Sequence, residues 1–281
     1  VTGGGTGLGL AMSTALAVQG AKVYITGRRK EVLDKAVSDF QTSGGSESGG
    51  LLIALQMDVT NRESILEGVK IVEKEGYLSL LINNAGIAKG IHKELYDAKN
   101  QGAEAYSKAM LNYKESEFEL VYGTNVVSPW FVSAAFLPLL GKAKAANSPK
   151  DGALPQSIIN LTSISGVTKE SQSGQQIYNS SKAALVSLTN MMATELADPS
   201  IGIRVNSIAP GVFPSEMTTG FPDASDREAY LARGYVAGRV SPLPSPGLPS
   251  EIASTCLFLA TNHFMHGQHI VIDGGWLLNH R

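Results

Sequence analysis

The chain opens with the stretch that decides its fold, Thr2-Gly3-Gly4-Gly5-Thr6-Gly7-Leu8-Gly9, and a helical pattern over residues 8–19 follows it. A glycine-rich turn that leads into a helix presents unpaired backbone N–H groups at the positive end of the helix dipole, where an anion such as pyrophosphate is favoured. The glycines allow that anion to approach closely. The spacing is TGxxxGxG and not the GxGxxG dinucleotide fingerprint. The turn alone therefore allows two interpretations, a plain helix cap or a nucleotide-cofactor site.

Apolar runs rich in β-branched residues alternate with helical patterns along the rest of the chain. Strands are predicted at 22–26, 51–56, 78–82, 157–161, 204–208 and 269–272, and helices at 8–19, 30–40, 62–75, 117–140, 177–197 and 250–260. Repeated βα units predict a mainly parallel sheet with helices on both faces. We expect one doubly wound, Rossmann-like α/β domain over residues 1–281. Because only Val1 and Thr2 precede the first glycine, we also expect missing N-terminal residues and an incomplete first strand.

Four segments interrupt this alternation, at residues 42–50, 87–116, 142–156 and 214–249. The first and third are rich in small and polar residues and are expected to be mobile loops. Within the second, residues 106–113 have helical spacing and predict a small helix. The proline-rich end of the fourth, residues 241–249, cannot form regular helix or central strand. We expect a lid over about 212–249.

The composition favours small-molecule chemistry in a cytoplasmic protein. The chain has 281 residues, 43% of them hydrophobic, which is enough for a substantial core. A net charge of −2, with both signs mixed along the chain, argues against a nucleic-acid or polybasic membrane surface. No apolar stretch is expected to span a bilayer. Cys256 is the single cysteine, so no intramolecular disulfide can form, and its apolar surroundings indicate a buried, inert thiol. No metal site is predicted.

Basic residues follow the predicted strand at 22–26, in Thr26-Gly27-Arg28-Arg29. An NAD-selective site would place an acidic residue here for the ribose hydroxyls, whereas arginine can form charge-assisted bonds to a 2′-phosphate. We therefore expect NADP(H) to be preferred over NAD(H), unless Arg28 and Arg29 are only solvated residues at a helix start. Asp58, followed by Val59, could accept a hydrogen bond from the adenine amino group or could cap the next helix.

A tyrosine and a lysine stand four residues apart in Tyr178-Asn179-Ser180-Ser181-Lys182, which on a helix places them on one face. A nearby ammonium favours the phenolate, so we expect Lys182 to lower the pKa of Tyr178. Tyr178 could then donate a proton to a substrate oxygen, or remove one in the oxidative direction. Lys182 would also bind the nicotinamide ribose.

Polar residues end other predicted strands at the edge where α/β sheets build their sites. Ser163 follows the strand at 157–161 and can orient a carbonyl, and Asn83-Asn84-Ala85-Gly86 ends the strand at 78–82. Asn125 interrupts an apolar helical segment, where a buried amide needs a partner. A lone YxxxK pattern occurs by chance, but this order of motifs is much more specific.

With these residues in place, the sequence resembles the short-chain dehydrogenase/reductase family over essentially its whole length. The resemblance is carried by the glycine turn, the Asn83 to Gly86 motif, the residues already quoted around Tyr178, and by Asn206, Pro210-Gly211, Gly267-Gln268 and Asp273-Gly274-Gly275. It implies a catalytic tetrad of Asn125, Ser163, Tyr178 and Lys182, in which Asn125 holds a water that links Lys182 to solvent. It also implies a homotetramer or homodimer built on the helices that contain Asn125 and Tyr178.

The resemblance also implies a cofactor site made of the residues Thr2, Gly3, Gly5, Thr6, Gly7, Leu8, Gly9, Arg28, Arg29, Asp58, Val59, Asn84, Ala85, Gly86, Tyr178, Lys182, Pro210, Gly211, Val212 and Ser215. Two departures from the family pattern bear on this site. The stretch from Ser163 to Tyr178 is about two residues longer than is usual in the family, so Ser165 is an alternative serine. The insertion between Gly86 and Asn125 is long and leaves the substrate mouth undefined.

The sequence thus predicts an NADP(H)-dependent oxidoreductase, a ketoreductase or alcohol dehydrogenase with Tyr178 as general acid and base. The alternative is a non-catalytic NADP(H)-binding protein of regulation or assembly. A nucleotide-sugar epimerase is disfavoured by the glycine spacing. The aromatic and apolar residues of the expected lid suggest a moderately hydrophobic ketone as substrate, although they could equally be ordinary packing of an amphipathic helix: Phe213, Met217, Phe221, Tyr230 and Tyr235.

Overall fold

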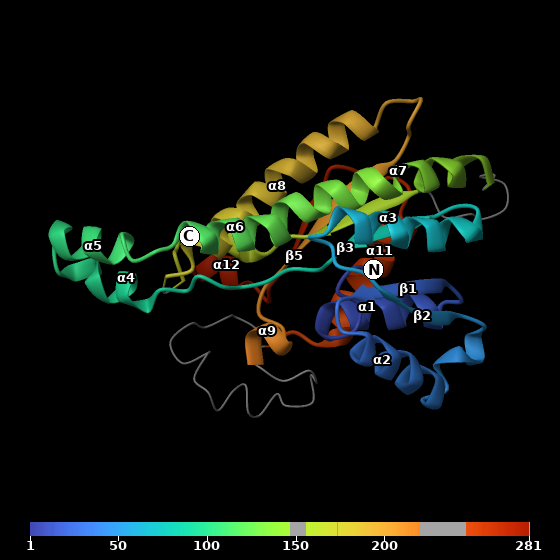
Figure 1. Cartoon of the computed structure of the whole chain (residues 1–281), viewed down its shortest axis with the longest axis horizontal. Coiled ribbons are helices and arrows are strands. Elements are labelled where there is room, and N and C mark those ends of the chain that lie inside the picture. The colour runs from blue at the N-terminus through green and yellow to red at the C-terminus, as the bar shows by residue number, and fades with distance from the viewer. Residues whose placement is uncertain (147–155, 173, 220–245, 281) are drawn as a thin grey trace.

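The computed structural model describes residues 1–146, 156–172, 174–219 and 246–280 (Figure 1). Its strands are β1 (Lys22–Gly27), β2 (Leu51–Gln56), β3 (Leu80–Asn83), β4 (Ser157–Leu161), β5 (Arg204–Pro210) and β6 (His269–Ile272). They pair in parallel in two sections, β1-β2 and β3-β4-β5-β6. Short β-branched runs and βα alternation thus fold as a Rossmann-like α/β domain, as predicted.

The backbone of Val1 and Thr2 joins the two sections of the sheet. The Thr2 N–H donates to Ile82 O over 2.9 Å, and the Thr26 N–H donates to Val1 O over 2.9 Å. Thr2 also forms an isolated parallel bridge with Thr26. The glycine turn therefore starts between β1 and β3, in the middle of the sheet.

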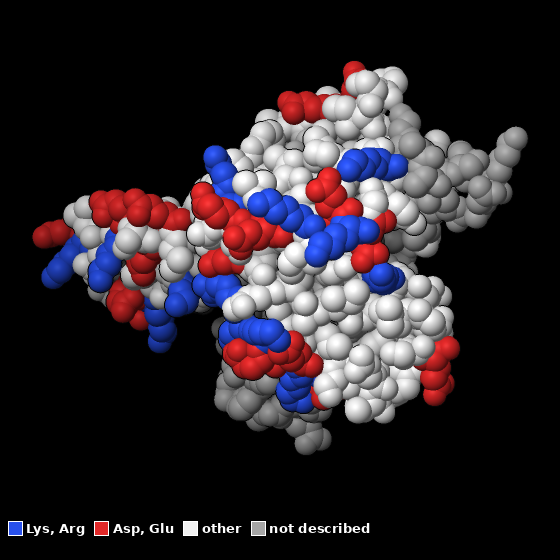
Figure 2. Space-filling view, turned by 45° about the vertical axis from the view of Figure 1, so that its right-hand side comes forward, with Lys and Arg blue, Asp and Glu red and all other residues white. Residues whose placement is uncertain are grey.

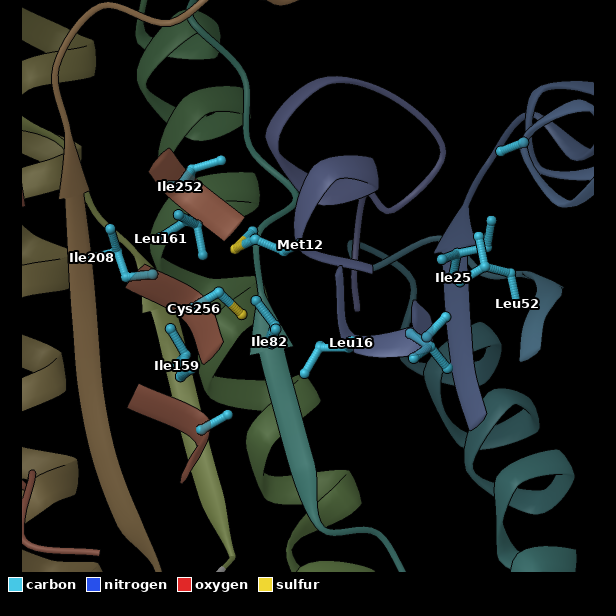
Figure 3. Packing of buried hydrophobic residues seen from close by; sticks show 14 of the residues in the cluster. Met12, Leu16, Ile25, Leu52, Ile82, Ile159, Leu161, Ile208, Ile252 and Cys256 are labelled. Carbon is cyan, nitrogen blue, oxygen red and sulfur yellow. The ribbon is translucent and has the colours of Figure 1, made fainter. Parts of the chain in front are cut away.

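The helices cover both faces of the sheet and enclose two cores. Those that reach the sheet or extend beside it are α1 (Gly7–Val18), α2 (Lys30–Thr42), α3 (Arg62–Val72), α6 (Glu115–Tyr122), α7 (Ser128–Ala146), α8 (Gln176–Leu196) and α11 (Pro249–Thr261). One core joins α1, α2 and α11 to the sheet, and Figure 3 shows Cys256 in it, beside Met12 and Ile82. The other joins α3, α7 and α8, with Val132, Phe136 and Met192 among its buried side chains.

The predicted bounds differ from the structure mainly where the sequence shows loops. The segment 87–116 contains α4 (Lys93–Asp97), η3 (Ala98–Asn100) and α5 (Ala103–Met110), so the small helix predicted at 106–113 begins earlier. Residues 45–48 form the 3-10 helix η1 (Gly45–Ser48), and α7 continues to Ala146. Beyond β5 lies α9 (Glu216–Thr219), and α12 (Trp276–Asn279) ends the described chain. The rest of the expected loop at 142–156, from 147 to 155, and most of the expected lid lie outside the described residues.

One helical run departs from the expectation that nothing in the chain is long and apolar enough to cross a membrane. The run Glu115–Ala143, which joins α6, the π-helical turn η4 (Gly123–Val127) and α7, is by length and composition sufficient to do so. Its apolar character is explained in part by packing, because Val132, Phe136, Leu139 and Leu140 lie buried against the sheet and α3.

Candidate active site

The glycine turn follows Thr2 and bends at Gly3 and Gly7, which have φ of 61° and 53°, a region that favours glycine. The Thr2 hydroxyl accepts hydrogen bonds from the N–H groups of Asn84 (2.9 Å) and Ala85 (3.0 Å), which ties the turn to the end of β3. Thr6 precedes α1 without a capping bond from its side chain. The N-terminus of α1, with Leu8 and Gly9 in its first turn, is therefore available to an anion.

Close backbone contacts explain why glycines occupy this turn. A Cβ at Gly9 would lie 2.2 Å from Gly3 O and 2.4 Å from Asn84 Nδ2, and a Cβ at Gly7 would lie 3.1 Å from the Ser215 Cβ. A Cβ at Gly5 would meet side-chain atoms of Leu33 and Val32 at 3.1 and 3.2 Å. The turn thus contacts both the Asn84 motif and the segment after β5, as a cofactor cradle at the centre of the sheet requires.

The two arginines after β1 differ in their contacts. Both are exposed, and Arg29 forms an ion pair with Glu216 of α9, with 2.7 Å between Nη2 and Oε2. Arg28 has no ion pair among the described residues. Asp58 Oδ1 accepts from the N–H and the hydroxyl of Thr60, at 2.9 and 2.7 Å, so the carboxylate closes a local turn. It does not cap α3, whose N-cap is Asn61, and the capping alternative for Asp58 is wrong; Val59 beside it is buried.

Tyr178 lies in the first turn of α8, close enough to Ser163, which follows β4, for the serine side chain to lower the pKa of the phenol. Ser163 Oγ also accepts from the Ser165 N–H over 3.1 Å and so starts the short 3-10 helix η6 (Ile164–Gly166). The Ser165 hydroxyl turns away and donates to Gln172 Oε1 over 2.7 Å. Of the two candidate serines, the structure therefore brings Ser163 to Tyr178.

Lys182 lies one helical turn after Tyr178 and points to the same place. Its Nζ lies 5.8 Å from the centre of the Tyr178 ring and donates to Leu161 O over 2.7 Å. The side chain is only 4% exposed, and burial lowers its pKa to about 8. Burial also raises the pKa of Tyr178, and the side chain of Ser163 offsets this only in part. The expectation of a lowered phenol pKa is therefore wrong for this structure, because desolvation of the phenolate raises the pKa by more than its polar neighbours lower it.

Asn125 lies in a π-helical turn, η4 (Gly123–Val127), that interrupts the helix expected to be continuous at 117–140. Such turns often occur at functional sites. Its Oδ1 accepts from the Ile87 N–H (2.9 Å), and its Nδ2 donates to Ile87 O and to Ser181 Oγ, both at 3.0 Å. A Cβ at Gly86 would lie 3.2 Å from Asn125 Oδ1 and 3.5 Å from Lys182 Nζ. Gly86 thus lets the amide and the ammonium converge.

The segment after β5 closes the other side of the site. The Gly211 N–H donates to Ile272 O, and the Gly247 N–H to Val212 O, so Pro210, Gly211 and Val212 are held beside β6. Phe213, expected in an apolar lid, is instead buried in the core that joins α1, α2 and α11 to the sheet. Met217 is exposed. The other three expected lid aromatics lie outside the described residues: Phe221, Tyr230 and Tyr235.

Several residues that contact the site were not predicted, because nothing in the sequence shows which distant residue a given side chain will contact. Glu216 faces Arg29 across 187 positions of sequence, and Ser181 inside the YNSSK motif holds Asn125. The hydroxyl of Ser181 could have been suspected from its place between Tyr178 and Lys182. Nothing in the sequence indicated Glu216, nor the cluster formed by His92, Tyr113 and Glu117.

Comparisons with known proteins agree with this geometry. A family model described as enoyl-(acyl carrier protein) reductase matches residues 3–277. The short-chain dehydrogenase/reductase PhomF of Diaporthe leptostromiformis is 35% identical over 99% of this chain and 90% of its own length. The 3-oxoacyl-(acyl-carrier-protein) reductase FabG of Thermotoga maritima is 31% identical over 99% of this chain and 96% of its own. The active-site complex of Pseudomonas aeruginosa RhlG with NADP superposes with a TM-score of 0.77 at 30% identity, covering 98% of this chain and 94% of that one.

Proposed function

The chain belongs to the short-chain dehydrogenase/reductase family, and on this premise we propose that it is an NADP(H)-dependent oxidoreductase that interconverts a carbonyl and an alcohol. The observation that carries the proposal is the meeting of Ser163 and Lys182 at Tyr178, beside the carboxyl end of β4. A phenol, a hydroxyl and a buried ammonium at one point are the groups that proton transfer to a carbonyl oxygen needs.

The glycine turn and its surroundings fit a nicotinamide dinucleotide. The uncapped start of α1 and the glycines at positions 3, 7 and 9 offer N–H groups and space to a pyrophosphate. Arg28 and Arg29 stand at the end of β1, where a 2′-phosphate would bind, and Asp58 and Val59 follow β2. Asn84 to Gly86 follow β3 and Pro210 to Ser215 end and follow β5, where they would hold the nicotinamide end. The NADP that the Pseudomonas aeruginosa RhlG complex contains supports the same choice of cofactor.

When bound, the cofactor supplies or accepts the hydride. The protein's own part is to place the substrate oxygen between Ser163 and Tyr178 and to move a proton there. Because burial raises the pKa of Tyr178, its phenol stays protonated at neutral pH and can donate to the oxygen of a carbonyl that is being reduced. Ser163 orients that oxygen, and Lys182 provides positive charge that favours the phenolate left behind. Asn125 fixes Ile87 and Ser181 around this group.

A direct test is the rate of NADPH oxidation with a panel of ketones, β-ketoacyl thioesters, quinones and sugars, followed by absorbance. We expect turnover of one class, with moderately hydrophobic ketones favoured. Tight NADPH binding without turnover of any carbonyl would support instead a non-catalytic NADP(H)-binding protein, and preferential turnover of small charged sugar acids would refute the proposed substrate class.

Loss of the Arg28 side chain should weaken the binding of NADPH and leave the binding of NADH nearly unchanged. In Arg28→Ala we expect the Kd for NADPH to rise about tenfold or more, the size of one charge-assisted hydrogen bond, because only NADPH carries the 2′-phosphate. Isothermal titration with each cofactor measures this. Glu216→Gln should have the opposite effect, because it removes the carboxylate that pairs with Arg29 and leaves the guanidinium free for the 2′-phosphate. The Kd for NADPH should fall by up to about fivefold. Equal losses for both cofactors in Arg28→Ala would contradict the proposed preference.

The rate of carbonyl reduction should fall as pH rises through about 8. Burial lowers the pKa of Lys182 to about 8, so the neutral amine predominates above that pH and the phenolate of Tyr178 loses its cation. The measurement is kcat/KM for the preferred carbonyl across the alkaline range, with the unfolding temperature recorded at each pH. A profile that stays flat to about pH 10, the usual pKa of a phenol, would contradict this role for Lys182.

We also propose that the protein is cytoplasmic, acts on a small molecule and assembles with copies of itself. Figure 2 shows Lys and Arg interspersed with Asp and Glu over the visible face, which favours a small substrate over a polyanion. Leu120, Val127 and Trp130 on the helix with Asn125, and Met191 on α8, are exposed apolar side chains. They support the proposal of a homodimer or homotetramer built on these helices.

A further inference from the structure

Residues 88–112 leave the body after Ile87 and form an arm that carries α4 and α5, at the left of Figure 1. The arm has a small core of its own, with Leu95, Ala98 and Ala109 buried. It is inserted between Gly86 and α6, so it starts and ends beside the candidate active site. How the arm is fastened at its base therefore bears on the catalytic geometry.

The start of the arm is attached to residues of the site. Both backbone polar groups of Ile87 bond the Asn125 side chain, at 2.9 and 3.0 Å. Three residues later the backbone of Gly90 passes so close to α8 that a Cβ there would lie 2.6 Å from Ile177 Cδ1. Ile177 is fully buried and directly precedes Tyr178.

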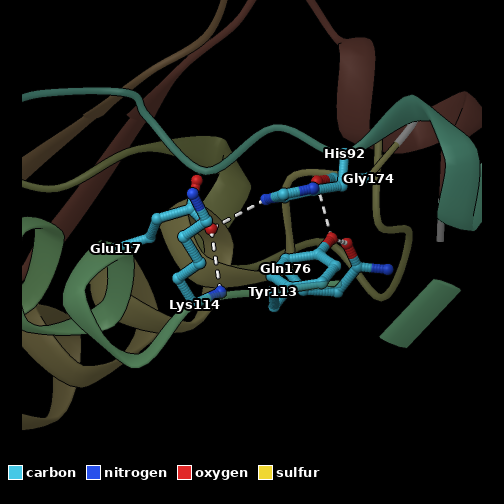
Figure 4. Close-up of polar contacts among 6 residues, drawn as sticks. All are labelled: His92, Tyr113, Lys114, Glu117, Gly174 and Gln176. Carbon is cyan, nitrogen blue, oxygen red and sulfur yellow. Dashed lines mark hydrogen bonds and ion pairs between the residues drawn. The ribbon is translucent and has the colours of Figure 1, made fainter. Parts of the chain in front are cut away.

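His92 near the start of the arm meets two residues that follow its end, Tyr113 and Glu117, in a cluster that we call the clamp (Figure 4). The rings of His92 and Tyr113 lie with centroids 3.9 Å apart at 34°. His92 Nε2 lies 2.9 Å from Glu117 Oε2, and the same oxygen accepts from the Lys114 N–H over 3.1 Å. These two contacts keep the pKa of Glu117 below its usual value, and the carboxylate ionised.

The clamp contacts the chain just before and at the start of α8, the helix that carries Tyr178 and Lys182. The His92 N–H donates to Gly174 O over 3.0 Å, and the Tyr113 hydroxyl lies 3.1 Å from Gly174 O and 2.8 Å from Gln176 Oε1. Gly174 has φ of 95°, and a Cβ there would lie 2.1 Å from His92 O, so only glycine permits this approach. Burial, with the charges of Tyr106 and Glu117, raises the pKa of Tyr113 to about 12, which keeps its hydroxyl a donor.

Resting on the proposed function, we propose that the clamp positions Tyr178, with Tyr113 as a positioning residue that fixes the first turn of α8 through Gln176. Gln176 is the first residue of α8 and lies two residues before Tyr178. Besides Glu117 on α6, the residues that hold the arm are Asn125 of the proposed tetrad and three residues within four positions before Tyr178: Gly174, Gln176 and Ile177. A small displacement of a reacting group can lower a rate by orders of magnitude. Loss of this anchorage should therefore lower kcat much more than it weakens the binding of the cofactor.

The test compares Tyr113→Phe, which keeps the ring on His92 and removes only the hydroxyl, with Tyr96→Phe. Tyr96 lies on the same arm, is half exposed, and its hydroxyl makes no hydrogen bond within the described residues. In Tyr113→Phe we expect kcat to fall about tenfold, the size of one hydrogen bond, with the Kd for NADPH unchanged. Gln176→Leu should give the same loss, the double variant should lose no more than either, and Gln176→Glu, which keeps the acceptor, should restore most of the rate. Tyr96→Phe should behave as the wild type.

Hydrogen–deuterium exchange of the backbone at residues 174–180 tests the clamp without turnover. We expect faster exchange in Tyr113→Phe and Gln176→Leu, and no change in Tyr96→Phe. Unchanged exchange would overturn the clamp. Faster exchange with wild-type kcat, or additive losses in the double variant, would overturn its positioning role. If the wild type reduces no carbonyl at all, the proposed function fails, whereas the exchange measurement still decides whether the clamp holds α8.

Discussion

Tyr178→Phe should lower the rate of carbonyl reduction by about a thousandfold, within the range that a general acid contributes, while the Kd for NADPH stays within a factor of about two. The phenyl ring fills the same space, so packing around Lys182 is kept. What disappears is the phenolic hydroxyl beside Ser163, which can donate a proton to the substrate oxygen. Steady-state kinetics with the preferred carbonyl and titration with NADPH measure the two quantities.

Tyr77→Phe is the matched control for this variant, because Tyr77 is exposed and its hydroxyl makes no hydrogen bond within the described residues. It should retain wild-type kcat and cofactor affinity. A Tyr178→Phe enzyme that keeps more than about a tenth of the rate would show that the proton comes from elsewhere, with water as the first alternative.

Gly9→Ala should abolish tight cofactor binding and destabilise the domain. The new methyl group would lie 2.2 Å from Gly3 O and 2.4 Å from Asn84 Nδ2. The turn must shift, and Asn84 must give up its bonds to Thr2 O (2.8 Å) and Gly3 O (3.0 Å). We expect the Kd for NADPH to rise about a hundredfold and the free energy of unfolding to fall by about 2 kcal/mol, a typical cost of overpacking. Calorimetric titration and urea denaturation measure the two effects.

Gly141→Ala is the control, because an added Cβ at this glycine would contact no other atom. Gly141 lies on α7, is exposed, and a Cβ there has no neighbour within 4 Å. Alanine is the better helix former by up to about 1 kcal/mol, so this variant should be as stable as the wild type or more so. Wild-type NADPH affinity in Gly9→Ala would contradict the cradle that we assign to the turn.

The positions of the main elements could be predicted because their signals are local. Period-two and helical patterns placed β2, β4 and β6 at the bounds that the structure has, and the glycine turn and Tyr178 stand at the strand and helix ends where such residues were expected. Each of these signals depends on residues that are near one another in the chain. The parallel pairing follows from the βα alternation itself.

The rest depends on partners that are distant in the sequence. The π-turn at Asn125 arises because its amide bonds Ile87, 38 positions away, and helical periodicity cannot show that. The direction of the Tyr178 pKa shift depends on how deeply the fold buries the ring, so spacing from Lys182 alone gave the wrong sign. The clamp joins residues that are separated in the sequence by the arm. The sequence of the arm predicts only a loop with one helix, so it gives no indication of these contacts.

The most direct measurement is transfer of deuterium to the alcohol product from NADPH that carries deuterium at both C4 positions of the nicotinamide, with the wild type and Tyr178→Phe in parallel. The account predicts that the wild type places the label on the carbon of the reduced carbonyl and that Tyr178→Phe binds the labelled cofactor with nearly no transfer. Product without the label, no transfer to any carbonyl despite tight NADPH binding, or equal transfer by Tyr178→Phe would contradict it.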